Sequence, residues 1–112
     1  DYSPIDYSRA PSSRSSALPN TVYTGTYAND LYGHLEVVVE NGKLAMKQGP
    51  HKLAYPLSHY DHDTFYYETA GENAVGLSGV TFTIEGDGKA SRVVVENLNK
   101  DGLGTFARLL IK

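Results

Sequence analysis

The sequence predicts an all-β protein, an antiparallel up-and-down barrel of about eight short strands that follows a disordered or extended N-terminal linker. Three observations predict this fold. Several short runs alternate apolar and polar residues with the two-residue period of a strand. Turn signals such as Asn41-Gly42 separate these runs at regular intervals. Nine Tyr and three Phe, against one Met and no Trp, fit a pleated, half-buried surface.

The expected strands lie near 22–28, 34–40, 43–48, 52–57, 63–69, 79–85, 90–98 and 104–111. In the first strand Tyr23, Gly25 and Tyr27 share one face. The second reads LEVVVE, so that Leu and Val alternate with Glu. The Asn41-Gly42 pair then predicts a type I′ turn into the third strand, because both positions of that turn need positive φ.

The later strands are marked by the same signals. The clearest run, VTFTIE, places Val80, Phe82 and Ile84 on the inner face. The sequence EGDGK then predicts a tight hairpin, NKDG predicts another turn before the last strand, and the Gly-rich stretch 70–78 predicts a mobile loop. Because most connections are short, neighbouring strands should pair in meander order and close into a barrel.

Bulky residues at inward positions predict a mostly filled barrel with at most a shallow mouth. The inward candidates are Tyr23, Tyr27, Leu35, Val37, Met46, Phe65, Phe82, Ile84 and Phe106.

Size and composition restrict the classes of function. A chain of 112 residues forms one domain, and a net charge of −3 without a run of Lys or Arg disfavours nucleic-acid binding. The absence of Cys excludes disulfides and thiolate metal sites. No apolar run is long enough to span a membrane and no signal peptide is visible. A start at Asp1 rather than Met is compatible with a fragment of a longer protein, and in that case an export signal would lie upstream of the given residues.

Residues 1–20 are expected to be a linker, and residues 21–112 the barrel domain. The first segment, DYSPIDYSRAPSSRSSALPN, holds three of the five Pro and few apolar groups, which fits a tether between two domains. In the alternative interpretation Tyr2, Ile5 and Tyr7 dock on the barrel or on a neighbouring domain.

An ordered set of motifs spans residues 21–112. It consists of Tyr23-x-Gly25-x-Tyr27-x-Asn29, Tyr32-Gly33, Gly49-Pro50, the segment PLSHYDHDTF at 56–65, and Thr105-Phe106-Ala107-Arg108. The set resembles the lipocalin-like C-terminal domain, DUF3471-like and of unknown function, of serine β-lactamase-like hydrolases. These are bacterial relatives of penicillin-binding proteins, of the peptidase S12 type. Tyr60 departs from the family pattern, which has Trp there, and this affects local packing only.

The resemblance implies a non-catalytic accessory domain without a cofactor. Its partner would be a serine β-lactamase-like catalytic domain in the same polypeptide, and the barrel would help to shape substrate access or subunit assembly, with a homo-oligomer as one outcome. A periplasmic or secreted location follows by analogy alone. A competing hypothesis is a stand-alone lipocalin-like carrier of a small apolar ligand in the barrel mouth. A third, an independent hydrolase, has no supporting motif.

Tyrosines are the candidate docking residues, because Tyr combines a large contact area with a polar tip. They are Tyr32, Tyr55, Tyr60, Tyr66 and Tyr67, and packing within the barrel is the alternative role for each. Arg108 shares a face with Phe106 and Leu110, where we expect it to pair with an acidic residue and pack on an aromatic ring. A bound ligand carboxylate is the alternative partner of Arg108.

The densest group of possible metal ligands is His59, Asp61, His62 and Asp63. In an extended strand three of these four would share a face, and His34 or His51 could complete a divalent-ion site. The favoured interpretation is structural: the Asp residues make turn hydrogen bonds and His59 and Tyr60 pack under the barrel end.

Catalytic motifs are absent from the sequence. A β-lactamase-type nucleophile needs Ser three residues before Lys, and no Ser of this chain has Lys at that spacing. Tyr27-Ala28-Asn29 matches the Tyr-x-Asn element of those enzymes by accident, because it lies on a barrel strand. The stretch GLGTFA at 102–107 leads into a strand instead of a helix, so it is not a dinucleotide-binding turn.

Overall fold

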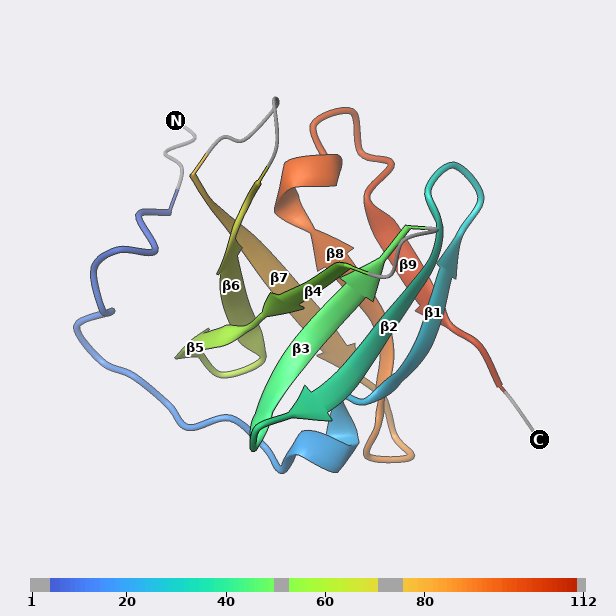
Figure 1. Ribbon diagram of the computed structural model, residues 1–112. Helices are drawn as coiled ribbons and strands as arrows, with labels where there is room; N and C mark the ends of the chain where they lie inside the picture. Colours follow the sequence, from blue (N-terminus) through green and yellow to red (C-terminus); the bar gives the residue numbers. More distant parts are fainter. Residues whose placement is uncertain (1–4, 50–52, 71–75, 111–112) are drawn as a thin grey trace.

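The computed structural model describes residues 5–49, 53–70 and 76–110, and its strands form one antiparallel sheet (Figure 1). The strands are β1 (Gly25–Asn29), β2 (Gly33–Glu40), β3 (Lys43–Gln48), β4 (Leu53–Pro56), β5 (Ser58–Asp61), β6 (Thr64–Glu68), β7 (Leu77–Ile84), β8 (Ala90–Val95) and β9 (Thr105–Arg108). Two 3₁₀ turns, η1 (Asn20–Val22) and η2 (Glu96–Leu98), precede β1 and follow β8.

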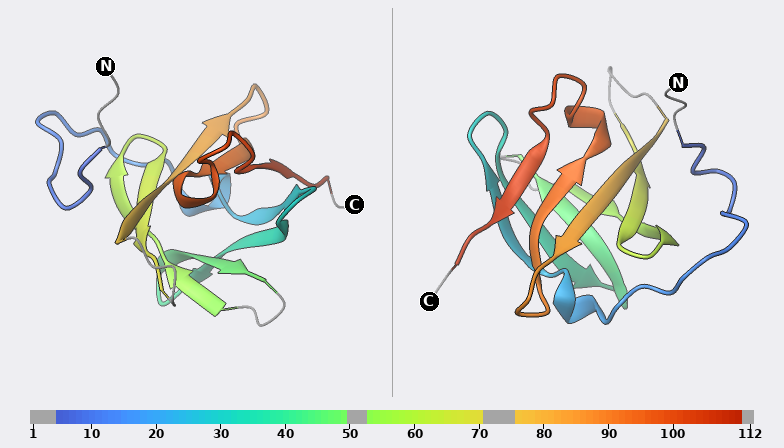
Figure 2. Two further views of the ribbon diagram at one scale, coloured as in Figure 1. Left: turned by 90° about the horizontal axis from the view of Figure 1, so that it is seen from above. Right: turned by 180° about the vertical axis from the view of Figure 1, so that it is seen from behind.

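The sheet curls into a nearly closed barrel. Its strand order is β4-β3-β2-β1-β9-β8-β7-β6-β5, so sequence neighbours pair at every step except β4 to β5, and β1 also pairs with β9. Figure 2 shows the sheet curling around a common interior. The predicted all-β meander barrel is therefore confirmed.

The barrel closes where the chain bends between β4 and β5. Only Leu57 separates β4 from β5, and its backbone N–H donates a 2.9 Å hydrogen bond to Leu44 O. Before this point the chain pairs with β3, and after it the chain pairs with β6. The described strands thus number nine instead of about eight, because residues 58–62, which lay between two predicted strands, contain β5. The chain passes here from the part of the sheet that contains β3 to the part that contains β6. We call the line along which these two parts meet the seam.

Some strand ends differ from the prediction. β1 begins at Gly25, because Pro19 starts a 3₁₀ turn in which the N–H of Tyr23 bonds to Asn20 O. β8 ends at Val95, since the next three residues form η2, and β9 ends at Arg108. The predicted mobile loop falls mainly on 71–75, which lies outside the described residues.

The hairpins follow the predicted turn chemistry. Asn41 and Gly42 both have positive φ, 54° and 79°, as a type I′ turn requires. The β7–β8 connection closes with a hydrogen bond from Glu85 N to Lys89 O. These short connections make the strands on either side of each turn neighbours in the sheet.

Aromatic side chains fill the barrel. Eight of the nine predicted inward residues are buried, and Ile84 is half-buried against them. The ring of Phe82 lies 4.9 Å from that of Tyr23 and 5.7 Å from that of Phe65, at the tilted and edge-on angles that aromatic pairs prefer. The interior is therefore a packed core.

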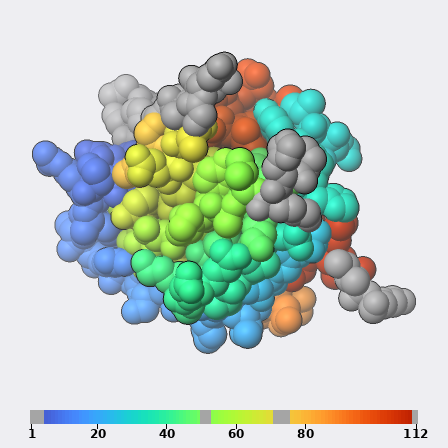
Figure 3. Space-filling view, viewed as in Figure 1, coloured from blue at the N-terminus to red at the C-terminus, as the bar shows by residue number. Residues whose placement is uncertain are grey.

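Residues 5–19 form neither helix nor strand and lie along the outside of β5 and β6. We call this segment the strap. In Figure 3 it runs in blue beside the yellow-green surface of these strands.

Candidate functional site

The strap is anchored to the barrel by Tyr7. Its ring is buried and packs edge-on against Tyr60 at 5.0 Å and stacked on Tyr66 at 5.8 Å. Its hydroxyl donates a 2.8 Å hydrogen bond to Glu96 Oε2. The ring fits there because Gly79 beneath it has no Cβ, and an added Cβ would collide with the Tyr7 hydroxyl. Long-range packing therefore holds the strap.

Of the three residues considered for docking, Tyr7 contacts the barrel. Ile5 is 50% exposed, and Tyr2 lies outside the described residues.

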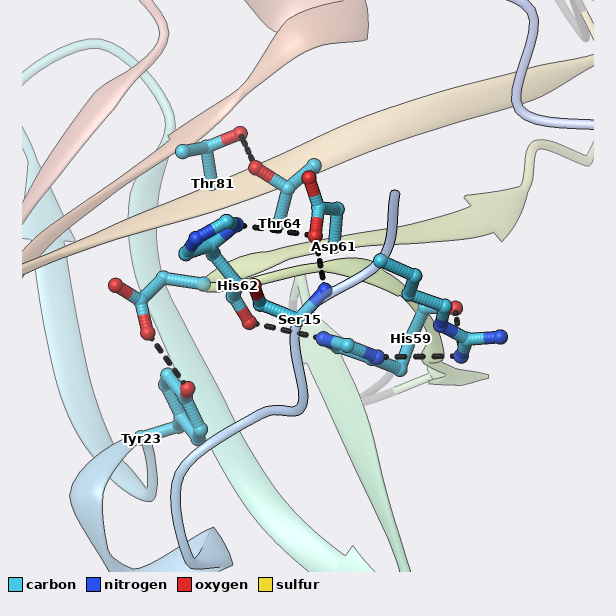
Figure 4. A network of polar contacts seen from close by, with 9 residues as sticks. Ser15, Tyr23, His59, Asp61, His62, Thr64 and Thr81 are labelled. Atoms are coloured by element: carbon cyan, nitrogen blue, oxygen red, sulfur yellow. Dashed lines mark hydrogen bonds and ion pairs between the residues drawn. The ribbon is translucent and has the colours of Figure 1, made fainter. Parts of the chain in front are cut away.

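A second anchor joins the strap to the end of β5 (Figure 4). Ser15 N donates a 2.7 Å hydrogen bond to Asp61 Oδ1, and His62 N donates one of 3.0 Å to Ser15 O. Arg14 Nη2 donates to His59 O at 3.0 Å and lies 3.2 Å from His59 Nδ1. The backbone of Ser15 thus bonds the Asp61 side chain and the His62 backbone, while the Arg14 side chain bonds the backbone of β5.

The contacts of His59 define its tautomer. A guanidinium can only donate, so Nδ1 must accept the hydrogen bond from Arg14. Nε2 then carries the proton and donates to His62 O at 2.9 Å. The ring also packs edge-on against Phe65 at 5.2 Å. His59 therefore serves as a bridge between the strap and the β5–β6 turn.

The two carboxylates of this segment serve different neighbours. His62 has φ 50°, and this turn conformation separates Asp61 from Asp63. The hydrogen bond from Ser15 N, with the nearby His62 as a smaller cause, lowers the pKa of Asp61. Asp63 Oδ1 accepts the hydroxyl of Tyr23 at 2.7 Å.

Tyr23 connects this turn to the strap. Its hydroxyl accepts a 3.0 Å hydrogen bond from Leu18 N while it donates to Asp63. Burial, followed by the hydrogen bond with Asp63, raises the pKa of Tyr23 to about 12. Tyr23 therefore joins the core, the strap and the β5–β6 turn.

The considered metal ligands do not converge. Among the described residues no three His, Asp or Glu side chains are arranged to hold a metal ion. His34 is exposed on β2, and His51 lies outside the described residues.

The five candidate docking tyrosines lie in three separate places. Tyr60 and Tyr66 are half-buried under the strap. Tyr55 and Tyr67 meet across the seam with ring centres 5.3 Å apart, and burial raises the pKa of Tyr67. Tyr32, 38% exposed, stacks on Phe106 at 6.3 Å. The sequence candidates therefore do not form one surface.

Arg108 closes the end of the barrel near β1. Its guanidinium carbon lies 5.0 Å from the centre of the Tyr27 ring, and Nη2 donates to Tyr27 Oη at 3.0 Å and to Val22 O at 3.2 Å. Nε donates to Ala90 O. An added Cβ on Gly25 would meet the guanidinium. The described partners are thus carbonyls and a hydroxyl in place of the expected carboxylate.

The contact with Arg108 also affects the pKa of Tyr27. Burial raises the pKa of Tyr27 to about 12, and the positive charge of Arg108 partly opposes this effect. Leu110, which alternation placed on the same face as Arg108, lies beyond β9 and is 88% exposed.

Asn29 is a further residue with several contacts that sequence reasoning left out of the candidate set. Its Nδ2 donates to Leu103 O at 2.7 Å and Thr105 O at 2.8 Å, and its Oδ1 accepts the N–H groups of Leu31 and Tyr32. Asn29 thereby holds together the β1–β2 and β8–β9 connections at one end of the barrel. Leu31 of the first connection is 62% exposed, and Leu103 of the second is 54% exposed. An Asn before a turn was the available signal.

The described cavities lie on the outside of the barrel. A groove of about 280 Å³ follows the seam between Tyr55 and Tyr67. A hollow of about 420 Å³ lies beside Leu31 and Leu103. A third, of about 400 Å³, is bordered by the strap at Arg14.

None of the helical segments described is long and apolar enough to cross a membrane.

Comparisons with known proteins identify a domain family and a similar solved structure. The model of the family described as domain of unknown function DUF3471 matches residues 9–105. The crystal structure of the C-terminal domain of penicillin binding protein Rv0907 superposes with a TM-score of 0.79. It is 31% identical in sequence, and the match covers 95% of this chain and 100% of that domain. No curated protein gives a significant match.

Proposed function

Because the chain belongs to the DUF3471 family of domains of unknown function, we propose that it is a non-catalytic accessory domain that packs against a serine β-lactamase-like or peptidase domain of the same polypeptide. The single observation that carries this proposal is the match, over nearly the whole chain, to a domain described as C-terminal in a penicillin binding protein. In that role the barrel shapes access of substrate to the catalytic domain or the assembly of subunits.

The contacts of the polar side chains support a structural role for them. Asp61 and His59 hold the strap, Asp63 bonds Tyr23, and Arg108 bonds backbone carbonyls. These groups already have partners within the chain. The packed interior likewise counts against a carrier that holds a ligand in the barrel mouth.

The end of the barrel that carries Leu31 and Leu103 is the contact surface that we propose. Both side chains are more than half exposed, although Asn29 holds the backbone around them in place. Figure 1 shows that the β1–β2 and β8–β9 connections lie at this end, as does the first described part of the strap. A rigid backbone that presents apolar side chains loses little entropy when a partner covers them.

The experiment compares the longer gene product with variants in this surface. The coding sequence upstream of Asp1 should contain a Ser-x-x-Lys motif, and a fluorescent penicillin should label that part of the protein and leave the 112-residue chain unlabelled. Leu31→Asp with Leu103→Asp should free the barrel from the catalytic domain, seen as faster proteolysis between them. Val39→Asp is the matched control, because Val39 is 48% exposed on β2, near the opposite end. Labelling of the isolated chain would contradict the non-catalytic role.

A further inference from the structure

The groove between the strap and the barrel is the starting point. It measures about 400 Å³ and lies where the strap crosses from β5 toward the start of β3. Its floor includes Leu44, Leu57 and Phe65, three residues of the core that are 3–5% exposed. The volume is in the range of small-molecule sites, about 300–1,000 Å³. The groove therefore combines a rigid apolar floor with a size that suits a ligand.

The charge of the groove is opposite to that of the whole chain. The chain has 13 acidic and 10 basic residues, yet none of the described residues lining the groove is Asp or Glu. Arg14 and Lys43 both line it. A local excess of positive charge above an apolar floor favours an anion with an apolar body.

Both cations are available to a ligand. Within the described part of the chain Arg14 forms no ion pair with a carboxylate: its described contacts are those of Nη2 with His59 O and Nδ1. Lys43 is opposite Glu40 in the β2–β3 register, but Glu40 pairs with Lys47 at 3.0 Å instead. Neither positive charge is thus neutralised by a described carboxylate.

We propose that this groove binds a small molecule that carries one carboxylate on an apolar body. The carboxylate pairs with Arg14, whose planar fork matches its geometry, and with Lys43. Ser58 and Asn20, which also line the groove, add hydrogen-bonding groups at the rim. The apolar body lies on Leu44, Leu57 and Phe65. This site lies outside the packed barrel interior and is independent of the proposed contact with a catalytic domain.

The test is a titration of the 112-residue chain with sodium octanoate, followed by amide proton–nitrogen correlation spectra. The expected result is saturable shifts at Lys43, Leu57, Ser58 and His59, with an affinity that falls as salt is added. Octanamide has the same body without the charge and should bind at least about tenfold more weakly, as loss of a charge-assisted hydrogen bond predicts. Equal binding of octanamide would overturn the proposal, as would shifts confined to other parts of the barrel.

Three groove variants separate the role of charge from that of structure. Lys43→Gln removes a charge that makes no described contact with the strap, so it should weaken octanoate binding while the spectrum stays folded. Arg14→Lys keeps the charge but loses the fork, and should bind more weakly than the wild type and more tightly than Arg14→Gln. Lys100→Gln, at an exposed position between η2 and β9, is the control and should bind as the wild type does. Unchanged affinity in Lys43→Gln and Arg14→Gln would overturn the site, and it would leave the accessory role unaffected.

Discussion

Tyr7 and Glu96 are 89 residues apart in the chain, yet the Tyr7 hydroxyl donates a 2.8 Å hydrogen bond to the Glu96 carboxylate. This contact fixes the strap over the β7–η2 corner. It depends on Gly79, whose missing side chain leaves room for the phenol ring. A segment with the composition of a linker is thereby joined to the core by one aromatic side chain.

Substitution Gly79→Ala should displace Tyr7 and destabilise the fold. The added methyl group would collide with the Tyr7 hydroxyl, and overpacking of this kind costs about 1–3 kcal/mol. Denaturant unfolding measures the loss. Gly86→Ala is the control, because nothing lies within 4 Å of its added Cβ. In a Tyr7→Ala background Gly79→Ala should cost less than it does alone. Equal costs in both backgrounds would disprove the coupling.

Substitution Asp61→Ala should loosen the strap without unfolding the barrel. The N–H of Ser15 loses its 2.7 Å acceptor, so exchange of the Ser15 amide proton with solvent should become faster. Asp87→Ala removes a similar Asp acceptor, that of Lys89 N, in the distant β7–β8 hairpin and should leave Ser15 unchanged. If Ser15 exchange is the same in both variants, Asp61 does not hold the strap.

Acid should have the same effect as Asp61→Ala. The pKa of Asp61 is lowered from its ordinary value of 3.8, chiefly by the hydrogen bond from Ser15. A carboxylate with a lowered pKa stabilises the folded form above its ordinary pKa, and this contribution is lost as the pH falls through the lower folded value. Ser15 exchange, corrected for its intrinsic pH dependence, should thus increase below about pH 3.8 in the wild type and be insensitive in Asp61→Ala.

Alkaline conditions should destabilise the core through Tyr23 and Tyr27. Burial raises the pKa of each phenol from 10.0 to about 12. A raised pKa contributes stability that is complete below pH 10 and is lost as the pH rises toward about 12. Ultraviolet difference spectra should show phenols that ionise late, Tyr23 and Tyr27 among them, and Tyr23→Phe and Tyr27→Phe should each remove one. Ionisation of all tyrosines near pH 10 in the folded protein would contradict the prediction.

Substitution Gly25→Ala should be more destabilising than Gly33→Ala. Both positions have φ values that favour glycine, 151° and 81°, which cost a side chain about 1–2 kcal/mol. Only at Gly25 would the new Cβ also displace the Arg108 guanidinium from Val22 and Tyr27. Thermal unfolding compares the two variants. Equal losses would show that Arg108 moves aside without cost.

Local patterns predicted most of the barrel. The type I′ hairpin at Asn41-Gly42 and the inward face of Val80 and Phe82 needed only the two-residue period and the preference for positive φ. The family was likewise identified from an ordered set of short motifs, and the comparisons confirm it. What these patterns have in common is that each depends on residues close together in the chain.

The candidate residues were predicted less well, because their partners are distant in sequence. Arg108 was expected to pair with a carboxylate, but it bonds Val22 O and Tyr27. Tyr7 docks on the barrel as the alternative interpretation of the strap allowed, whereas the anchor at Ser15 could not be inferred from composition, which favours disorder for this segment. Asn29 was read as part of a motif, although it holds two loops together.

The sequence by itself determined the strand pattern, the turns and the family, because alternation and turn chemistry are local properties of the chain. Only the tertiary structure decided that the chain bends at Leu57 and exchanges β3 for β6 as its partner, and that the strap lies on β5. The physical reason is that a backbone N–H or a buried ring takes whichever partner the closed barrel brings within reach, and that partner is set by the whole sheet.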